Sequence, residues 1–153
     1  MASARVRAAT AEDWPFIRAL IPRLTTFGPE WRDRQQMTAT EARAVEESLT
    51  GGDPERAVLV AEDGQERLGF IELWTMTDYF TGERHGHISN LVVAPESERR
   101  GVGRALIAAA EAWCGERGYR MLTLHVFDAN RGARVLYERS GFAVDMLRYV
   151  KPL

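Results

Sequence analysis

Residues 87–106 read HISNLVVAPESERRGVGRAL, an apolar strand followed by a loop with two glycines and the start of an alanine-rich helix. Such a strand–loop–helix unit points several free backbone N–H groups at one spot, where the helix dipole adds positive potential. Gly101 and Gly103 let the backbone approach an anion without a Cβ in the way. Three arginines supply charge at the same place: Arg99, Arg100 and Arg104. The stretch predicts a phosphate-binding loop, and a plain strand–helix turn with a solvated basic cluster is the alternative.

Length and charge limit the classes of protein. The 153 residues are 45% hydrophobic and 27% charged, which predicts a single domain over residues 1–153. Because 20 Lys and Arg stand against 22 Asp and Glu, no overall basic field exists to hold nucleic acid or an anionic membrane. The first residues lack a secretory signal, and no apolar run approaches the roughly 18 residues of a membrane span. We therefore expect a cytoplasmic protein with neither nucleic-acid nor membrane partners.

The cysteine content excludes another kind of site. Cys114 is the only cysteine, so an internal disulfide is impossible and a structural metal site has little to build on. Its small and apolar neighbours favour a buried core thiol. No bound metal is expected.

The rest of the chain predicts a mixed α/β sheet in which an antiparallel meander precedes one βα crossover. The expected strands cover residues 4–8, 57–61, 68–75, 85–93, 121–126 and 143–150. The first expected helix follows Thr10 and ends near Pro22, and the others cover residues 38–49, 103–117 and 130–139. Thr38 and Glu41 have capping-box spacing at the start of the second helix, after an irregular loop over residues 25–36.

A second motif follows the predicted phosphate loop. Its residues are Asn130, Ala133, Leu136, Tyr137, Gly141 and Phe142. Together with Leu91-Val92-Val93 before a proline and the arginine-rich loop ending Gly-x-Gly, it resembles the signature motifs of the GNAT acetyltransferases. The resemblance is close over residues 87–142 and implies a GNAT-like acyl-CoA N-acyltransferase fold. In that fold a central, mostly antiparallel sheet is splayed at the cofactor site and flanked by helices.

The resemblance implies acetyl-CoA as the cofactor. The pyrophosphate would lie on backbone amides of the loop, contributed by Arg99, Arg100, Gly101, Val102, Gly103 and Arg104. The pantetheine arm would pair with peptide groups at Leu91 and Val93, and an amide at Leu91 or Val92 would face the thioester oxygen. Asn130 would contact the pantetheine or the phosphates, beside Ala133 and Tyr137, although Asn130 also suits a plain helix N-cap.

One position departs from the family. Glu98 stands where the family usually has Gln or Arg, and it brings an acid near the phosphates. We expect its side chain to point outward, because the backbone amides carry most of the binding.

Two proton transfers are expected at this site. Tyr137 resembles the family's general acid, since a phenol with a pKa of about 10 stays protonated at pH 7 and can donate to the departing thiolate. His87 and Ser89 stand where many members place a base, and two-residue alternation puts both on the face of Leu91. His87 titrates in the useful range and can act directly or through water. The alternative bases are Glu72, Asp78 and Glu83.

The acceptor is expected to bind the loop between the first two helices and the connection before the splayed strand. The candidates are Glu30, Trp31, Trp74, Asp78 and Tyr79. Acids mixed with aromatic side chains suit a cationic amine, although polar loops whose aromatics pack on the core or at a dimer contact have the same composition. Residues 143–150 have the apolar edge character that would allow a homodimer.

The sequence thus predicts an N-acetyltransferase that moves the acetyl group of acetyl-CoA directly to a primary amine of a small molecule or peptide. No covalent acetyl-enzyme is expected. The alternative is a non-catalytic acyl-CoA-binding domain, or a regulatory or interaction domain, on the same fold.

Overall fold

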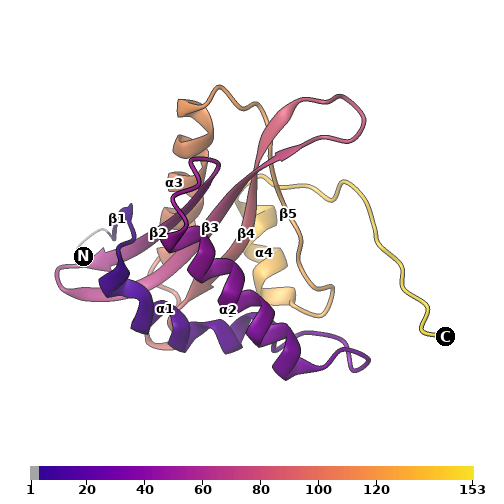
Figure 1. Ribbon diagram of the computed structural model, residues 1–153, viewed down its shortest axis with the longest axis horizontal. Helices are drawn as coiled ribbons and strands as arrows, with labels where there is room; N and C mark the ends of the chain where they lie inside the picture. The colour runs from indigo at the N-terminus through magenta and orange to yellow at the C-terminus, as the bar shows by residue number, and fades with distance from the viewer. Residues whose placement is uncertain (1–3) are drawn as a thin grey trace.

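Five strands form one sheet in the order β1-β2-β3-β4-β5 in this computed structural model, which describes residues 4–153 (Figure 1). They are β1 (Arg5–Ala8), β2 (Arg56–Asp63), β3 (Glu66–Thr77), β4 (Arg84–Val93) and β5 (Leu122–Leu124). Each of the first four strands pairs antiparallel with the next, and β5 runs parallel to β4. The predicted mixed sheet, with a meander followed by one crossover, is confirmed.

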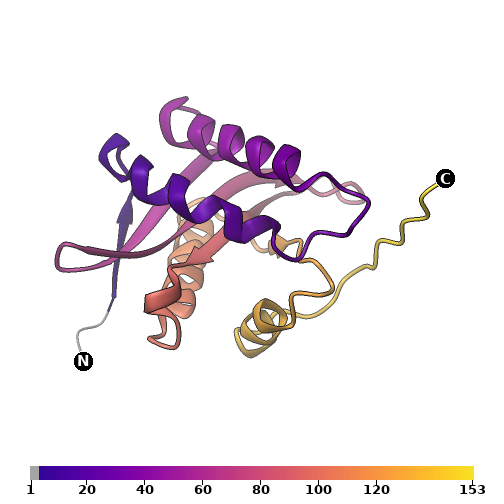
Figure 2. The same cartoon turned by 90° about the horizontal axis from the view of Figure 1, so that it is seen from below.

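Helices cover both faces of the sheet. As Figure 2 shows, α1 (Trp14–Leu20) and α2 (Arg34–Thr50) lie on one face, and α3 (Val102–Glu116) and α4 (Arg131–Arg139) lie on the other. The short 3-10 turns are η1 (Ala11–Asp13), η2 (Ile21–Thr25) and η3 (Pro95–Ser97). None of the helices within residues 4–153 has the length and apolar character that crossing a membrane requires.

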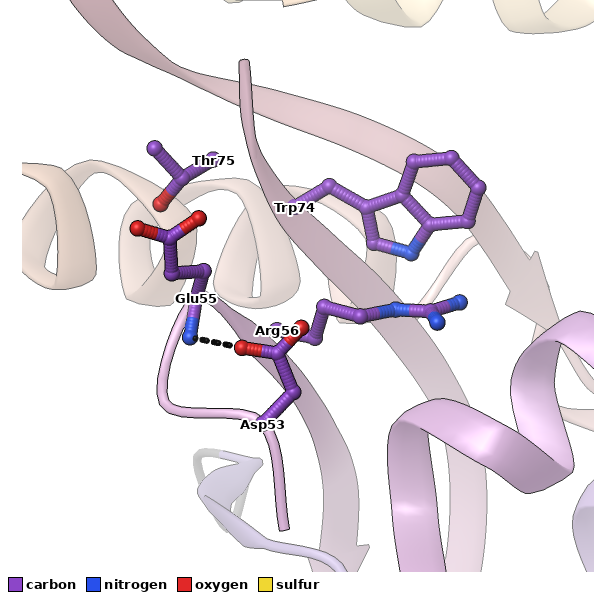
Figure 3. Close-up of a pocket in the computed structure, with 5 residues that line it drawn as sticks. All are labelled: Asp53, Glu55, Arg56, Trp74 and Thr75. Carbon is purple, nitrogen blue, oxygen red and sulfur yellow. Dashed lines mark hydrogen bonds between the residues drawn. The ribbon is translucent and has the colours of Figure 1, made fainter. Parts of the chain in front are cut away.

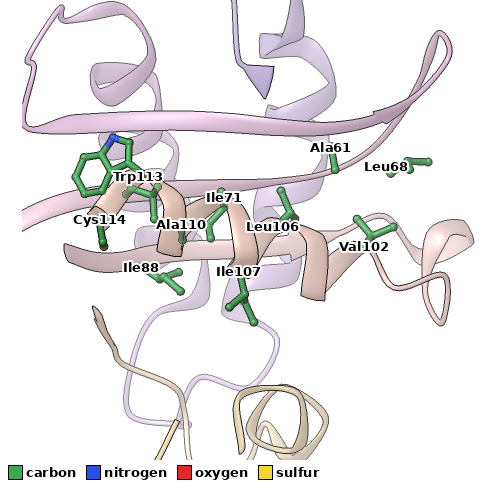
Figure 4. Close-up of a cluster of buried hydrophobic side chains, with 11 residues drawn as sticks. Ala61, Leu68, Ile71, Ile88, Val102, Leu106, Ile107, Ala110, Trp113 and Cys114 are labelled. Carbon is green, nitrogen blue, oxygen red and sulfur yellow. The ribbon is translucent and has the colours of Figure 1, made fainter. Parts of the chain in front are cut away.

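Two apolar clusters form the core, one on each face. Alternation along β3 divides its side chains between them: Ile71 packs under α3, whereas Phe70 packs under α1 and α2. Figure 4 shows the α3 cluster, in which Leu106 and Ala110 face the sheet. Cys114 belongs to this cluster and is only 5% exposed, which confirms the predicted core thiol.

The second helix begins earlier than the spacing of Thr38 and Glu41 predicted. The carboxylate of Asp33 accepts hydrogen bonds from the backbone N–H groups of residues 35 and 36 and caps α2 there. Thr38 lies inside the helix, and its hydroxyl donates to the carbonyl one turn earlier. The predicted start is therefore wrong, and the irregular loop is shorter than expected.

Residues 143–150 do not form the predicted closing strand. They run away from the sheet as an extended tail, drawn in yellow in Figures 1 and 2. Val144, Met146 and Tyr149 are 67%, 71% and 89% exposed, so nothing in the described chain buries the apolar pattern that predicted a strand. A strand forms only where a neighbour takes its backbone hydrogen bonds. The adjacent edge strand, β5, is itself only 3 residues long, shorter than the predicted 121–126.

One extra residue interrupts the pairing of β4 with β3. Asn90 lies opposite Glu72, and Ile88 lies opposite the next residue of β3, Leu73. Ser89 therefore has no partner of its own and forms a β-bulge. A bulge breaks the two-residue alternation, so side chains before and after it exchange faces.

The bulge overturns the prediction that His87 lies on the face of Leu91. His87 lies opposite Trp74, whose indole donates a hydrogen bond to Ser48 of α2. Leu91 instead packs against the cluster under α3. The side chain of His87 is therefore on the α2 face of the sheet.

Close packing of β4 on α3 requires a glycine at position 86. A Cβ there would overlap the thiol of Cys114 and crowd Leu122. We expect Gly86→Ala to lower the free energy of unfolding by about 1–3 kcal/mol in urea denaturation. The double variant with Cys114→Ala should lose less than the sum of the two single variants.

Gly115→Ala is the matched control, because a Cβ there meets no atom within 4 Å. It should leave stability unchanged or slightly raised. A Gly86→Ala protein as stable as the parent would contradict the packing described here.

Candidate functional site

β4 and β5 separate after a short paired segment. Their register runs from Gly86 opposite Leu122 to Ile88 opposite Leu124, and beyond Ile88 only β3 pairs with β4. Residues 89–93 therefore border an opening where β5 has left the sheet. This is the splayed arrangement that the resemblance implied.

The peptide groups of Leu91 and Val93 face this opening. The N–H of Ala94 donates to the carbonyl of Leu68 in β3 at 2.8 Å. Because alternate residues of a strand direct their peptide groups to the same side, Val92 also faces β3 and its two neighbours face away. Peptide groups without a strand partner are where an extended ligand can pair.

The loop before α3 has the backbone shape of an anion site. Arg99 (φ 63°) and Gly101 (φ 77°) both have left-handed backbone. Gly101 is the N-cap of α3, so the first N–H groups of the helix point out of its end toward the loop. Turns of this kind gather N–H groups into a concavity, and the helix dipole adds positive potential. The geometry supports a phosphate site at the place that the sequence predicted.

Gly103 has a packing role in the first turn of α3. A Cβ at this position would lie 2.8 Å from Cδ2 of Leu136. The glycine therefore lets α4 approach α3 closely.

The acid that departs from the family is neutralised. Glu98 accepts a hydrogen bond from the guanidinium of Arg23 at 2.5 Å, and this ion pair joins the loop to η2. Its charge is therefore compensated within the fold.

The three loop arginines differ in their partners. Arg100 lies 3.4 Å from Asp63 and 3.5 Å from Glu66, at the turn between β2 and β3. Arg99 and Arg104 are exposed, and neither forms an ion pair within the described chain. Arg99 and Arg104 are thus the two arginines left to meet an anion.

Asn130 and Tyr137 lie on α4. The side-chain oxygen of Asn130 accepts the N–H of Ala133 at 3.2 Å and caps the helix, which is the plain role considered for it. Tyr137 packs against the α3 cluster, with its ring edge-on to Phe142 at 5.8 Å. Burial raises the pKa of Tyr137 above its usual value of 10. The phenol is therefore protonated at pH 7.

His87 is buried and neutral. Its Nδ1 lies 2.8 Å from the hydroxyl of Thr123, and its ring centroid lies 4.9 Å from that of His125. Burial, followed by the charges of His125 and His85, lowers the pKa of His87 to about 4. The prediction that His87 titrates near neutral pH is therefore wrong.

Within residues 4–153, no three His, Cys, Asp or Glu side chains are grouped so as to hold a metal ion.

A pocket of about 380 Å³ lies between the first turns of α2 and the chain after β5. Its lining residues are Trp31, Arg32, Asp33, Gln36, Met37, Thr40, Glu41 and Phe127. Of the five predicted acceptor residues, only Trp31 lines it.

The other four predicted acceptor residues lie elsewhere. Trp74 lines a smaller pocket of about 160 Å³, where the guanidinium of Arg56 lies 4.5 Å from its ring centroid (Figure 3). Asp78 accepts two backbone N–H groups in the turn between β3 and β4, and Tyr79 is 90% exposed in that turn. Figure 1 shows this hairpin well apart from the start of α2. Glu30 is exposed and lines neither pocket.

Glu41 is one of the pocket residues that sequence reasoning missed. Glu41, Val45 and Ser48 follow i, i+4, i+7 spacing, and the last two are only 0% and 7% exposed. This stripe faces the sheet, so a carboxylate on it could have marked Glu41 as a candidate site residue. The capping-box spacing assigned Glu41 to a helix start instead.

Comparison with known proteins identifies the family. The sequence profile of the acetyltransferase (GNAT) family matches residues 17–142. The chain therefore belongs to the GNAT acetyltransferase family, as its two motifs indicated.

Individual relatives match over part of their length. An uncharacterized N-acetyltransferase of Bacillus subtilis is 34% identical over 91 residues, 60% of this chain and 61% of that protein. A mycothiol acetyltransferase of Beutenbergia cavernae is 35% identical over 137 residues, 78% of this chain and 44% of that protein. An aminoglycoside N-acetyltransferase solved in complex with CoA is 20% identical, has a TM-score of 0.73, and is matched over 99% of this chain and 96% of its own. The last comparison shows a shared fold.

The lowered pKa of His87 makes stability depend on pH. The folded protein keeps the ring neutral down to about pH 4, whereas the unfolded chain protonates it below about pH 6.5. Between these values the unfolded state binds more protons, so stability falls as the pH falls. We expect His87→Gln to remove about 2–3 kcal/mol of the stability loss between pH 6.5 and pH 4, measured by urea denaturation.

His125→Gln is the control for this prediction, since His125 is exposed. It should retain most of the pH dependence. If His87→Gln loses stability as steeply as the parent, the ring is not held neutral by the fold.

Proposed function

We propose that this protein transfers the acetyl group of acetyl-CoA to a primary amine of a small molecule or peptide. One observation carries the proposal: the strand whose peptide groups have lost a partner, β4, leads directly into the loop at the N-terminus of α3. A ligand with an extended amide arm and a diphosphate end would satisfy both features at once.

The donor would be held by backbone more than by side chains. The N–H groups of residues 99–104 would bind the diphosphate, with Arg99 and Arg104 as exposed counter-ions. Leu91 and Val93 would pair with the pantetheine arm along the open side of β4. Asn130 caps α4 through its side-chain oxygen. Its amide nitrogen would remain free to donate a hydrogen bond to acetyl-CoA near Ala133. The fold neighbour solved with CoA supports this choice of ligand.

The reactive end would lie where β4 and β5 separate. Acetyl-CoA supplies an activated thioester there. A backbone N–H at Leu91 would donate to the carbonyl oxygen as negative charge develops on it, because the N–H of Val92, the other predicted donor, faces β3. Tyr137, kept protonated by burial, would give its proton to the departing sulfur.

Ser89 borders the opening, and His87 lies just before it, where β4 still pairs with β5. A pKa of about 4 means that His87 holds a proton too weakly to deprotonate an ammonium group by itself. We propose that it acts through water, together with Ser89 on the bulge. Another group would then accept the proton that the ammonium group of the acceptor loses.

The acceptor class follows from the family and from two relatives. One relative is named for mycothiol and one fold neighbour for aminoglycosides. Both names support a small-molecule amine, and a peptide amine is the second acceptor that the proposal covers. The homodimer also stays a prediction, supported by the exposed apolar side chains of the tail over residues 143–150.

The test is acetyl-CoA-dependent release of free thiol across a panel of polyamines, aminoglycosides, amino acids, arylalkylamines and short peptides. Saturable release with one class would establish the activity and identify the acceptor. A protein that binds acetyl-CoA but acetylates no amine in the panel would indicate either an untested protein substrate or a non-catalytic acyl-CoA-binding domain.

Tyr137→Phe tests the assigned proton donor. The phenyl ring keeps the packing against Phe142 but has no proton to give. We expect turnover to fall about 10²-fold or more with little change in acetyl-CoA affinity. Turnover that is unchanged in steady-state assays would remove Tyr137 from this role.

A further inference from the structure

A fully buried carboxylate lies between the sheet and α2. Glu72 of β3 is 0% exposed. One of its oxygens accepts hydrogen bonds from Ser48 at 2.6 Å and Trp74 at 2.8 Å, and the other accepts from Asn90 at 2.6 Å. Arg56 lies 3.5 Å away. The negative charge of Glu72 is therefore compensated inside the fold.

Asn90 connects this buried charge to the pocket beside α2. Its amide nitrogen also donates to Glu41 at 2.9 Å, so its two hydrogens serve two carboxylates. Glu41 is thereby held at a fixed place. Asn90 directly precedes Leu91, whose peptide group faces the opening. The carboxylate of Glu41 thus stands on the α2 side of the point where the donor's acetyl group would lie.

Glu41 lacks a cationic partner among residues 4–153. It lines the pocket of about 380 Å³, whose apolar walls include Trp31, Met37 and Phe127. Burial raises the pKa of Glu41, and the charge of Glu72 raises it further. A carboxylate in such surroundings gains more from a bound cation than one in water.

The other charged groups around the pocket differ from Glu41. Asp33 and Arg32 line the same pocket with opposite charges, and the carboxylate of Asp33 caps α2. His87, on the same face of the sheet, is neutral above about pH 4. Because Asp33 is exposed and uses one oxygen to cap α2, Glu41 is the half-buried carboxylate that the pocket offers to a ligand.

We propose that this pocket is the acceptor site and takes a primary ammonium group carried on an aromatic or aliphatic arm. Glu41 is the counter-ion and the base, and Asn90 and Glu72 are positioning residues for it. The inference rests on the proposed acetyl transfer and adds the acceptor class and the base.

The reaction balances with the groups named. The ammonium nitrogen gives one proton to Glu41, and its freed electron pair forms the bond to the acetyl carbonyl carbon. The carbon–sulfur bond breaks, its electron pair leaves on sulfur, and sulfur takes a proton from Tyr137. The second proton lost by nitrogen returns to Tyr137 through water. Glu41 then releases its proton to solvent, so one proton is released for each amide formed.

Binding of matched probes tests the site without turnover. The probes are phenethylamine and its neutral counterpart phenethyl alcohol, titrated calorimetrically at pH 7 into protein saturated with CoA, which has no acetyl group to transfer. We expect the parent to bind the amine about 10- to 100-fold more tightly than the alcohol. Glu41→Gln keeps the size of the side chain and should lose this preference. Glu46→Gln, exposed on the same helix, should keep it.

Equal affinity for the two probes, binding of neither, or an amine preference that survives in Glu41→Gln would overturn the proposal. CoA affinity should be the same in the parent and in both variants. A variant that has lost CoA affinity has not folded. With any amine that is turned over, Glu41→Gln should raise KM and lower kcat/KM about 10- to 100-fold. An unchanged kcat/KM would refute the site and leave the acetyltransferase proposal standing. An amine preference without turnover of any amine would refute the acetyltransferase proposal, and the role of Glu41 as base with it.

Discussion

The extra residue that β4 carries at Ser89 is the constraint on which the rest of the site depends. Before the bulge, His87 faces α2 and Ile88 faces α3; after it, Asn90 faces α2 and Leu91 faces α3. Pairing with β5 ends at the same place. One inserted residue thus directs two polar side chains to the α2 face and starts the opening between the strands. Bulges commonly have both effects, because an unpaired residue twists its strand.

The two sides of the opening carry groups of opposite charge. On the α3 side, N–H groups at a helix terminus and two exposed arginines offer positive potential, and Arg23 neutralises Glu98 in the loop. On the α2 side, the buried carboxylate of Glu72 is compensated by four partners, and Asn90 links it to Glu41, which has one hydrogen-bond donor among residues 4–153. An anionic donor and a cationic acceptor would therefore approach from different sides and meet at β4. The arrangement separates their binding sites without a further domain.

Features with a local cause were predictable from the sequence. The loop before α3 depends on its own residues and on the helix that follows, and it lies where the two glycines indicated. Features that depend on a partner were not. The bulge at Ser89 exists only relative to β3, so alternation along β4 alone assigned His87 to the wrong face. At α2, Asp33 reaches two N–H groups and determines the start, although Thr38 and Glu41 carried the clearer pattern. In residues 143–150, alternation shows which side chains can be buried and says nothing of a neighbouring strand.

The contact between Gly86 and Cys114 has a chemical consequence. The thiol of Cys114 is 5% exposed and fills the space that a Cβ at position 86 would need. Burial raises its pKa. Thiolate is the form of cysteine that attacks disulfides and alkylating reagents. A thiol that is both covered and protonated therefore reacts slowly with them. In an assay of thiol release, such reagents would therefore detect the thiol of free CoA rather than Cys114 of the folded protein.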